Sequence, residues 1–308
     1  MHEASLLNKI LSLSPYIELL FRIFYWKTKL FKGLNKGRFK SNNITSINIE
    51  NVFNVLKDFG VCKGDLLILH SSYERLASSN IPPNEMINRF LDFIGFDGTL
   101  AMNAGRSLKW SQEDGAFIYD VQKSRVWTGV LPALMIKRKD AKISKFPINS
   151  MVAIGPKAEA MMSENLAGHL PSSCGPNSSW KYCLDNGAWI VGLGIDLTHS
   201  LTMIHVAEEC KNEMWPIKGW FEQIKYKIID RDKTNFITAN VRKEKWGKIH
   251  FAERTLALDL IKAGILKQKI VDGLMVEIIN AKNLIDYLEK RNHNGYPYFL
   301  HNISFLKL

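Results

Sequence analysis

The sequence has few cysteines and none of the short motifs that mark the commonest nucleotide, hydrolase and metal sites. Cys62, Cys174, Cys183 and Cys210 are scattered and form no CxxC pair, which excludes a disulfide framework and favours reduced thiols in a cytoplasmic protein. GxxxxGK[ST], GxGxxG, GxSxG, HExxH and hexapeptide repeats are all absent. These absences exclude P-loop nucleotide binding, serine hydrolysis on a nucleophile elbow and thermolysin-like zinc chemistry.

Long apolar runs are also missing. The longest N-terminal run, residues 16–26, is interrupted by Glu18 and Arg22 and is shorter than the roughly 20 residues that a spanning helix needs. No small-residue cleavage site follows it, so we expect no signal peptide. The chain of 308 residues is 46% hydrophobic and 23% charged, values that predict a globular protein with a sizeable core.

The positive charge is concentrated at the two ends of the chain. The net charge is +11, and residues 1–40 hold eight Lys or Arg against two acids. We interpret residues 1–40 as a basic helical arm that docks on the body or on a second subunit of a homodimer; contact with an anionic membrane surface is the alternative. The excess charge favours small anionic partners through long-range steering, and no nucleic-acid partner is expected.

From residue 41 onward, helix-like and strand-like segments alternate. Helical spacing of apolar residues covers 49–59 and 83–96, and buried strands are predicted at 65–70, 98–102, 151–154 and 188–193. A helix begins near Met203. This alternation predicts an α/β fold with a mostly parallel central sheet covered by helices on both faces.

The last hundred residues change character. Alternating segments at 224–230 and 235–241 predict an antiparallel hairpin, and two amphipathic helices follow near 252–263 and 281–291. We therefore expect residues 41–308 to form one domain, with a C-terminal subregion at about 215–308.

Three further segments stand out by their residue types. The first is His70-Ser71-Ser72 with Gly98-Thr99-Leu100, and the second runs from Thr128-Gly129-Val130-Leu131 to Ser144, Ser150 and Gly155. The third is Gly175-Pro176-Asn177-Ser178-Ser179-Trp180 followed by Thr202-Met203-Ile204-His205-Val206-Ala207-Glu208. In this order they resemble the aminoglycoside 3-N-acetyltransferase family over about residues 48–215.

The resemblance implies an acyl-CoA-dependent N-acyltransferase that uses acetyl-CoA or another acyl-CoA and no metal. The chain departs from the family pattern at Phe146, where the family has a histidine, and at Ile143, Ala133 and Ser179. The loop at 195–201 is longer than in the family pattern. The resemblance implies that these positions contact the acceptor or the phosphates of the cofactor. The differences therefore favour an acceptor other than an aminoglycoside.

Acyl transfer to an amine needs a base, and His205 is our candidate because imidazole titrates near neutrality. If 203–210 is helical, Glu208 lies on the same face and holds one ring nitrogen. The resemblance assigns both residues catalytic roles. The alternative is a structural His–Glu pair in the core.

The remaining site residues are expected to bind the two substrates. The turn after the strand that ends at His70 should face the thioester, and the start of a helix near Gly129 should receive phosphate. The candidates for acyl-CoA binding are Ser71, Ser72, Ser124, Arg125, Thr128, Gly129, Val130, Ser144 and Ser150. The candidates for acceptor binding are His70, His169 and Thr202.

The net charge bears on the identity of the acceptor. A basic chain repels polycationic aminoglycosides and attracts an anionic nucleotide-linked amino sugar of the kind used for surface polysaccharides. We therefore expect N-acylation of such a sugar, with an aminoglycoside as the alternative acceptor. The rivals are a non-catalytic relative and a zinc hydrolase that uses His199, His205 and Glu208.

Overall fold

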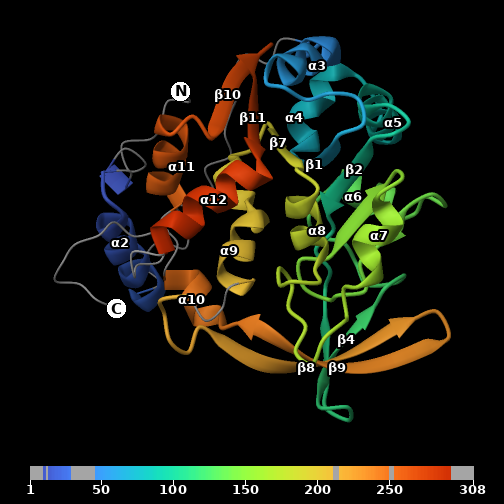
Figure 1. Cartoon of the computed structure of the whole chain (residues 1–308), viewed down its shortest axis with the longest axis vertical. Coiled ribbons are helices and arrows are strands. Elements are labelled where there is room, and N and C mark those ends of the chain that lie inside the picture. The colour runs from blue at the N-terminus through green and yellow to red at the C-terminus, as the bar shows by residue number, and fades with distance from the viewer. Residues whose placement is uncertain (1–9, 12, 29–45, 211–214, 250–252, 293–308) are drawn as a thin grey trace.

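Seven strands form the central sheet of the computed structural model, which describes residues 10–11, 13–28, 46–210, 215–249 and 253–292 (Figure 1). In sheet order they are β10 (Leu266–Val271), β11 (Leu274–Asn280), β7 (Trp189–Leu193), β1 (Leu66–Ser71), β2 (Thr99–Asn103), β6 (Met151–Ile154) and β5 (Lys142–Ile143). The α/β prediction is confirmed, and the six strand predictions, including the two hairpin strands below, match observed strands.

The strand directions differ from the mostly parallel arrangement that we expected. In the central sheet, only β1 pairs in parallel, with β2 on one side and β7 on the other. The other pairs, among them β11 with β7 and β6 with β2, are antiparallel. The hairpin of β10 and β11 causes part of this difference, because its turn at Asp272 and Gly273, both at positive φ, returns the chain against its own direction.

Helices cover both faces of this sheet. Successive residues of a strand point to opposite faces, so Leu66 and Ile68 of β1 enter one core while Leu67 and Leu69 enter the other. One face is covered by α3 (Ile49–Asp58), α4 (Tyr73–Leu76) with the 3-10 turn η2 (Ala77–Ser79), α5 (Pro83–Ile94) and α6 (Val130–Met135). The opposite face is covered by α7 (Ala158–Ser163), α8 (Ser179–Asp185), the 3-10 turns η3 (Leu197–Ser200) and η4 (Thr202–His205), α9 (Val206–Glu209), α11 (Glu253–Lys262) and α12 (Ala281–Asn292).

A second, four-stranded sheet lies at the end of the molecule opposite α3 (Figure 1). Its strands, in order, are β3 (Lys109–Ser111), β4 (Ala116–Asp120), β8 (Phe221–Asp230) and β9 (Lys233–Arg242). The predicted hairpin is confirmed as β8 and β9, which pair antiparallel along their full length. This long hairpin carries Arg242, its last residue, to the functional site described below.

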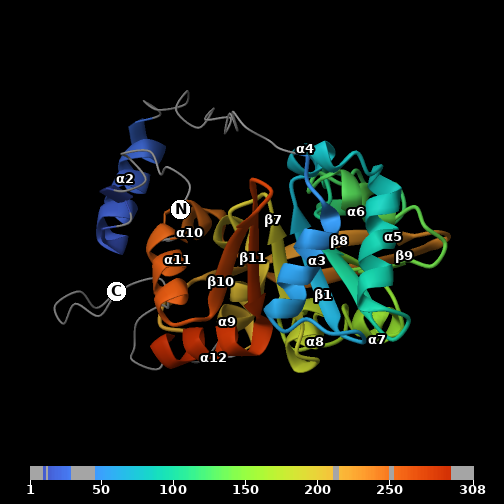
Figure 2. The same ribbon diagram turned by 90° about the horizontal axis from the view of Figure 1, so that it is seen from above.

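The N-terminal helix α2 (Pro15–Thr28) stands at one side of the molecule beside α10 (Glu244–Ile249) and α11 (Figures 1 and 2). Glu18 of α2 is fully buried and accepts hydrogen bonds from Arg254 at the start of α11. Residues 1–9, 12 and 29–40 of the predicted arm lie outside the described residues. In the part of the chain that the structure describes, no helix combines the length and apolar character needed to cross a membrane.

Gly155 follows β6 at a point where the chain meets the start of β2. Its φ is +129°, and a Cβ atom there would lie 2.3 Å from the carbonyl oxygen of Gly98. Gly155→Ala should therefore lower the free energy of unfolding by about 2–4 kcal/mol, from backbone strain and overpacking. Gly115→Ala, at φ +55° with no atom within 4 Å, should cost about 1 kcal/mol. Chemical denaturation of the two variants measures both values, and equal losses would contradict the packing argument.

Candidate active site

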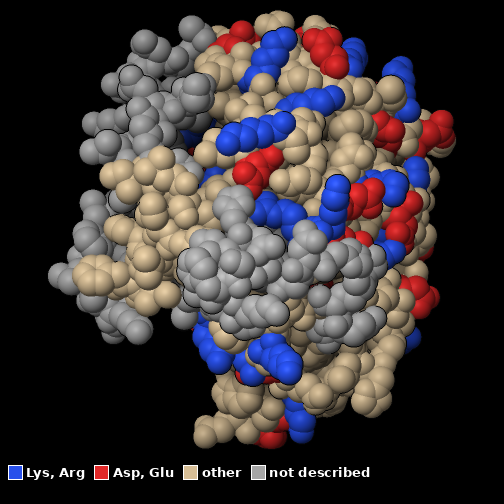
Figure 3. All heavy atoms as spheres, turned by 60° about the vertical axis from the view of Figure 1, so that its left-hand side comes forward, with Lys and Arg blue, Asp and Glu red and all other residues tan. Residues whose placement is uncertain are grey.

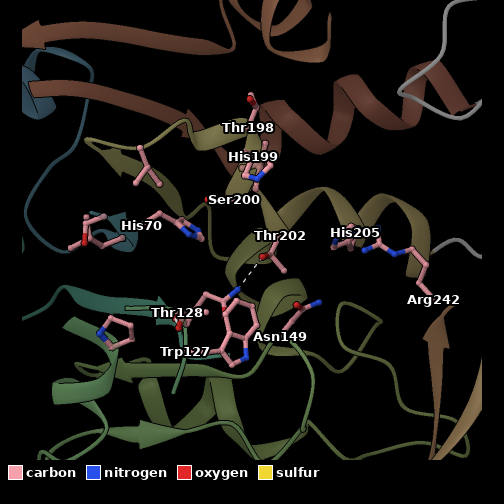
Figure 4. Close-up of a pocket in the computed structure, with 16 residues that line it drawn as sticks. His70, Trp127, Thr128, Asn149, Thr198, His199, Ser200, Thr202, His205 and Arg242 are labelled. Carbon is pink, nitrogen blue, oxygen red and sulfur yellow. Dashed lines mark hydrogen bonds between the residues drawn. The ribbon is translucent and has the colours of Figure 1, made fainter. Parts of the chain in front are cut away.

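The three mutually parallel strands β7, β1 and β2 end at the same edge of the central sheet, and a cavity of about 550 Å³ lies at this edge. Ligands in open α/β sheets bind beyond the carboxyl ends of strands. The cavity also receives side chains from η3, η4 and the end of β9 (Figure 4). Its lining residues are Leu69, His70, Ser71, Asn103, Trp127, Thr128, Pro132, Asn149, Ile195, Thr198, His199, Ser200, Leu201, Thr202, His205 and Arg242.

His205 and Glu208 form a hydrogen-bonded pair at the wall of this cavity. The chain passes from the 3-10 turn η4 directly into α9, so the two side chains, three residues apart, lie on one face. Nδ1 of His205 is 3.0 Å from Oε1 of Glu208, whose side chain is fully buried. The structure thus brings together the two residues that we predicted to be catalytic.

The base of the β8–β9 hairpin completes the surroundings of this pair. Nε1 of Trp220 donates to Oε2 of Glu208 at 3.1 Å, so each oxygen of the buried carboxylate accepts a hydrogen bond. The Trp220 ring packs against Trp215 and Trp246, with centroid distances of 5.0 and 5.5 Å. These contacts hold the carboxylate, and through it the imidazole, in one orientation.

The protonation of His205 follows from its partners. Nδ1 lies 3.0 Å from a carboxylate oxygen of Glu208, which accepts, and 3.3 Å from Nη1 of Arg242, which can only donate. We take the shorter contact as the hydrogen bond and assign the hydrogen to Nδ1, which leaves the lone pair on Nε2. Burial lowers the pKa of His205, and the Arg242 guanidinium, with Nη1 3.3 Å from Nδ1, lowers it further. The Glu208 carboxylate raises the pKa of His205. The imidazole is therefore neutral at pH 7, the form that accepts a proton.

Thr202 lies one 3-10 turn before His205, and residues three apart in such a turn share a face. Its Oγ1 accepts a hydrogen bond of 3.0 Å from Nδ2 of Asn103, the last residue of β2. Because this bond uses Oγ1 as an acceptor, the hydroxyl hydrogen of Thr202 remains available as a donor at the cavity wall.

The turn after β1 contributes less than we expected. His70 and Ser71 line the cavity, but Ser72 does not, and its backbone N–H donates to the carbonyl of Leu193 at 3.0 Å. That N–H is therefore not available to a thioester oxygen. His70 is 8% exposed, and its Nε2 has no hydrogen-bond partner in the described part of the chain. Burial lowers the pKa of His70 to about 4, so the ring is neutral.

The predicted phosphate-binding loop only partly reaches the cavity. Thr128 lines it and donates from Oγ1 to the carbonyl of Asn103 at 2.8 Å. Gly129 and Val130 start α6 but are not among the lining residues. Ser124 and Arg125 lie farther back in the loop: Oγ of Ser124 accepts from the Asp120 backbone, and the carbonyl of Arg125 accepts from Ser107.

Three other candidates lie outside the cavity lining. Ser144 and Ser150 are buried around Tyr119, whose hydroxyl donates to the Ser144 carbonyl at 2.8 Å and lies 3.2 Å from Oγ of Ser150. Both serines thus satisfy polar groups within the core. His169 is exposed on a loop and does not line the cavity.

Glu209, next to Glu208, has a different position and different partners. Its Oε2 accepts from the backbone N–H of Cys174 at 2.6 Å, and Ser173 donates to the same carboxylate. Ser173 also accepts a bond of 3.1 Å from Nδ2 of the lining residue Asn149. Glu209 therefore ties the loop that precedes Gly175-Pro176 to α9 and to one wall of the cavity.

The zinc interpretation finds no support in the part of the chain that can be described. No group of three or more His, Cys, Asp or Glu side chains there is arranged to hold a metal ion. His199 lines the cavity, and the carboxylate of Glu208 is already bonded to His205 and Trp220.

Several residues that line the cavity were not predicted from the sequence. Asn103 had a usable signal, because it is polar and follows a predicted strand that ends at the ligand-binding edge of the sheet. Trp127 and Asn149 lie in loops, where spacing predicts nothing about direction. Arg242 reaches the site from a different sheet, 37 residues beyond His205.

Removing either charged neighbour of His205 should shift its pKa, in opposite directions. Glu208→Gln removes the group that raises the pKa, so the value should fall. Arg242→Gln removes a group that lowers the pKa, so the value should rise. Titration of the imidazole by NMR measures both. Shifts of the same sign, or none, would contradict the electrostatic description of the pair.

Comparison with known proteins identifies the family. The profile described as aminoglycoside 3-N-acetyltransferase matches residues 68–292. Aminoglycoside N(3)-acetyltransferase III of Salmonella sp is 25% identical over 262 residues, covering 76% of this chain and 89% of that protein. Aminoglycoside N(3)-acetyltransferase IX of Micromonospora chalcea is 24% identical over 238 residues, covering 69% and 82%.

Solved structures share the fold. The aminoglycoside acetyltransferase AAC(3)-Xa superposes with a TM-score of 0.64 at 19% identity, covering 80% of this chain and 92% of that one. AAC-IIIb in a binary complex with CoASH gives 0.62 at 20% identity, covering 78% and 95%. The family profile covers most of the chain and ends within α12. The chain therefore belongs to the aminoglycoside 3-N-acetyltransferase family, whose members are acetyl-CoA-dependent N-acyltransferases.

Proposed function

We propose that this protein transfers the acetyl group of acetyl-CoA to the amino group of an amino-sugar acceptor, with His205 as general base. The observation that carries this proposal is the His205–Glu208 pair, whose imidazole ring lines the cavity. With the hydrogen assigned to Nδ1, Nε2 of this ring is able to accept a proton. Bound acetyl-CoA supplies the thioester whose carbonyl carbon the amine attacks.

His205 removes the proton that the attacking amine must lose. As the C–N bond forms, Nε2 accepts this proton, and the imidazolium is stabilised by the Glu208 carboxylate 3.0 Å from Nδ1. As the C–S bond breaks, the same proton is available to the departing sulfur of coenzyme A. His205 thus takes up the proton that the amine loses and supplies it to the sulfur of coenzyme A.

Thr202 is suited to stabilise charge on the carbonyl oxygen. Its hydroxyl hydrogen is available, and it lies on the same face of η4 as His205. We assign to this hydroxyl the role that we had expected of the turn at Ser71 and Ser72, because the Ser72 N–H is already bonded.

Two buried polar atoms near the cavity fit an amide-containing ligand such as the pantetheine arm of coenzyme A. Oδ1 of Asn103 and Nε2 of His70 have no hydrogen-bond partner among the described residues, although both side chains belong to the lining. An unpartnered buried polar atom is costly, so a bound N–H or carbonyl would stabilise the site. We also propose that Ser71 and Thr128, which line the cavity, and Gly129 and Val130, at the start of α6, bind acyl-CoA.

The relatives point to an aminoglycoside as the acceptor. The curated relatives are named aminoglycoside acetyltransferases, and the structural neighbour AAC-VIa was solved bound to sisomicin. An aminoglycoside carries several amino groups on linked rings, so one of its amines would lie beside His205. We therefore propose an aminoglycoside-type amine as the first candidate acceptor.

The cavity lining favours a second candidate, the nucleotide-linked amino sugar that we expected from the charge of the chain. Among the described residues, those that line the cavity include Arg242 and three histidines but no aspartate or glutamate. A polycation is matched by carboxylates, whereas an acceptor that carries phosphate is matched by a guanidinium. The net charge of +11 acts in the same direction at long range.

His205→Ala should lower turnover at least about a hundredfold, as expected for loss of a general base, while coenzyme A binding changes little. Thr202→Val should lower turnover by about tenfold or more, and Thr202→Ser should restore most of it. His169→Ala is the matched control, since this histidine is exposed and outside the cavity lining. Thiol release from acetyl-CoA measures all four, and near-normal turnover of His205→Ala would contradict the assignment.

A panel of amines tests the acceptor. We expect sisomicin to stimulate thiol release from acetyl-CoA, with the acetylated product confirmed by mass spectrometry. A nucleotide-linked amino sugar with a higher kcat/KM than sisomicin would establish the second candidate instead. If no amine in the panel stimulates thiol release although coenzyme A binds, the proposed transferase function is wrong.

A further inference from the structure

Helix α2 carries an exposed apolar stripe, formed by Leu13 just before it and by Ile17, Leu20 and Phe24. These side chains are 74%, 38%, 66% and 52% exposed. The spacing of Ile17, Leu20 and Phe24, three and four residues, places them along one face of α2, and Leu13 lies in the turn that precedes the helix. Figure 3 turns this side of the molecule forward; an uncharged area lies next to the residues drawn in grey, and Lys and Arg gather elsewhere on the face.

The opposite face of α2 is fixed to the body, so the stripe is held outward. Glu18, about half a turn away from the stripe, is fully buried. Its Oε1 lies 2.9 Å from Nη1 of Arg254 and 3.1 Å from Nη2 of Arg22, and its Oε2 accepts from the Arg254 backbone. Moving apolar side chains into the place of a buried carboxylate would separate the carboxylate from its donors. The loss of a buried charge's partners is strongly destabilising. Rotation of the helix to bury the stripe would break both bonds to Arg254, while the bond to Arg22 lies within α2.

The sequence that follows the stripe is strongly basic. From Lys27 to Lys40 there are six Lys or Arg and no Asp or Glu. A block of four to eight basic residues next to an amphipathic helix attracts anionic lipid headgroups, and this attraction needs no particular conformation. An apolar stripe held outward, with such a block following it in the sequence, matches the chemistry of an anionic membrane surface.

A second copy of the chain fits this stripe less well. Four side chains on one short helix offer little area, whereas stable protein interfaces bury about 1,200–2,000 Å² in total. Two copies of the chain also carry the same net charge of +11, and like charges repel. Anionic lipid, in contrast, attracts the same block.

We propose that the protein docks on anionic lipid surfaces through α2, with Leu13, Ile17, Leu20 and Phe24 entering the headgroup region. This inference is independent of the acetyl-transfer proposal. It accounts for an N-terminal helix that is bonded to the body on one side and apolar on the other, and it adds no membrane span.

Flotation of the full-length protein with vesicles tests the proposal. Binding should be strong to phosphatidylcholine vesicles that contain phosphatidylglycerol, at least about tenfold weaker to pure phosphatidylcholine, and weakened by about 0.5 M salt. The double variant Leu13→Asn/Leu20→Asn should bind at least about tenfold less. Phe96→Asn, which changes a side chain that is 97% exposed in the turn after α5, is the matched control and should bind normally. Thermal melting confirms that each variant is folded.

Three results would overturn the proposal. The first is equal binding of the double variant and the Phe96→Asn control, or no vesicle binding at all. The second is a dimer in light scattering that the double variant converts to monomers, which would show that a second copy covers the stripe. The third is a thiol at Leu20→Cys that reacts slowly without lipid and rapidly once residues 293–308 are removed, which would show that the C-terminal residues cover it.

Discussion

The hydrogen on Nδ1 of His205 determines what the cavity can do. We assign this hydrogen to the bond with Glu208, whose Oε1 lies 3.0 Å from Nδ1, and this assignment leaves the lone pair on Nε2. The reverse tautomer would present a donor at Nε2 and could not take a proton from an amine there. Burial and Arg242 keep the ring neutral, while Glu208 stabilises the charged form that arises during transfer. The imidazole is thus neutral at rest and able to hold one proton for a short time.

The fold supports this pair from two directions. The central sheet brings the ends of β7, β1 and β2 to one edge, where η4 and α9 carry His205 and Glu208. The base of the β8–β9 hairpin, in the second sheet, lies at the same edge. There Trp220 donates to the Glu208 carboxylate and Arg242 lies beside the His205 imidazole. A buried carboxylate is costly unless its oxygens are bonded. The β8–β9 hairpin therefore belongs to the active site, although it lies outside the central sheet.

The parts of the site that could be predicted are those that depend on local spacing. His205 and Glu208 are three residues apart, and a single helical turn brings them together whatever the rest of the chain does. Arg242 and Trp220 depend on how a second sheet packs, which no local pattern encodes. The strand positions followed from apolar runs, but their directions did not, because a buried strand has the same pattern in either direction. The Asp272-Gly273 pair is a hairpin signal in the sequence, and recognising it would have predicted the antiparallel pairing of β10 and β11.

The tautomer of His205 is the most direct test of the catalytic role proposed for this pair. Nitrogen-15 NMR of the imidazole ring in the free protein at pH 7 distinguishes a protonated from an unprotonated ring nitrogen at each position. We predict a neutral ring with the hydrogen on Nδ1 and an unprotonated Nε2. A ring with the hydrogen on Nε2, or a doubly protonated imidazolium at this pH, would contradict that role.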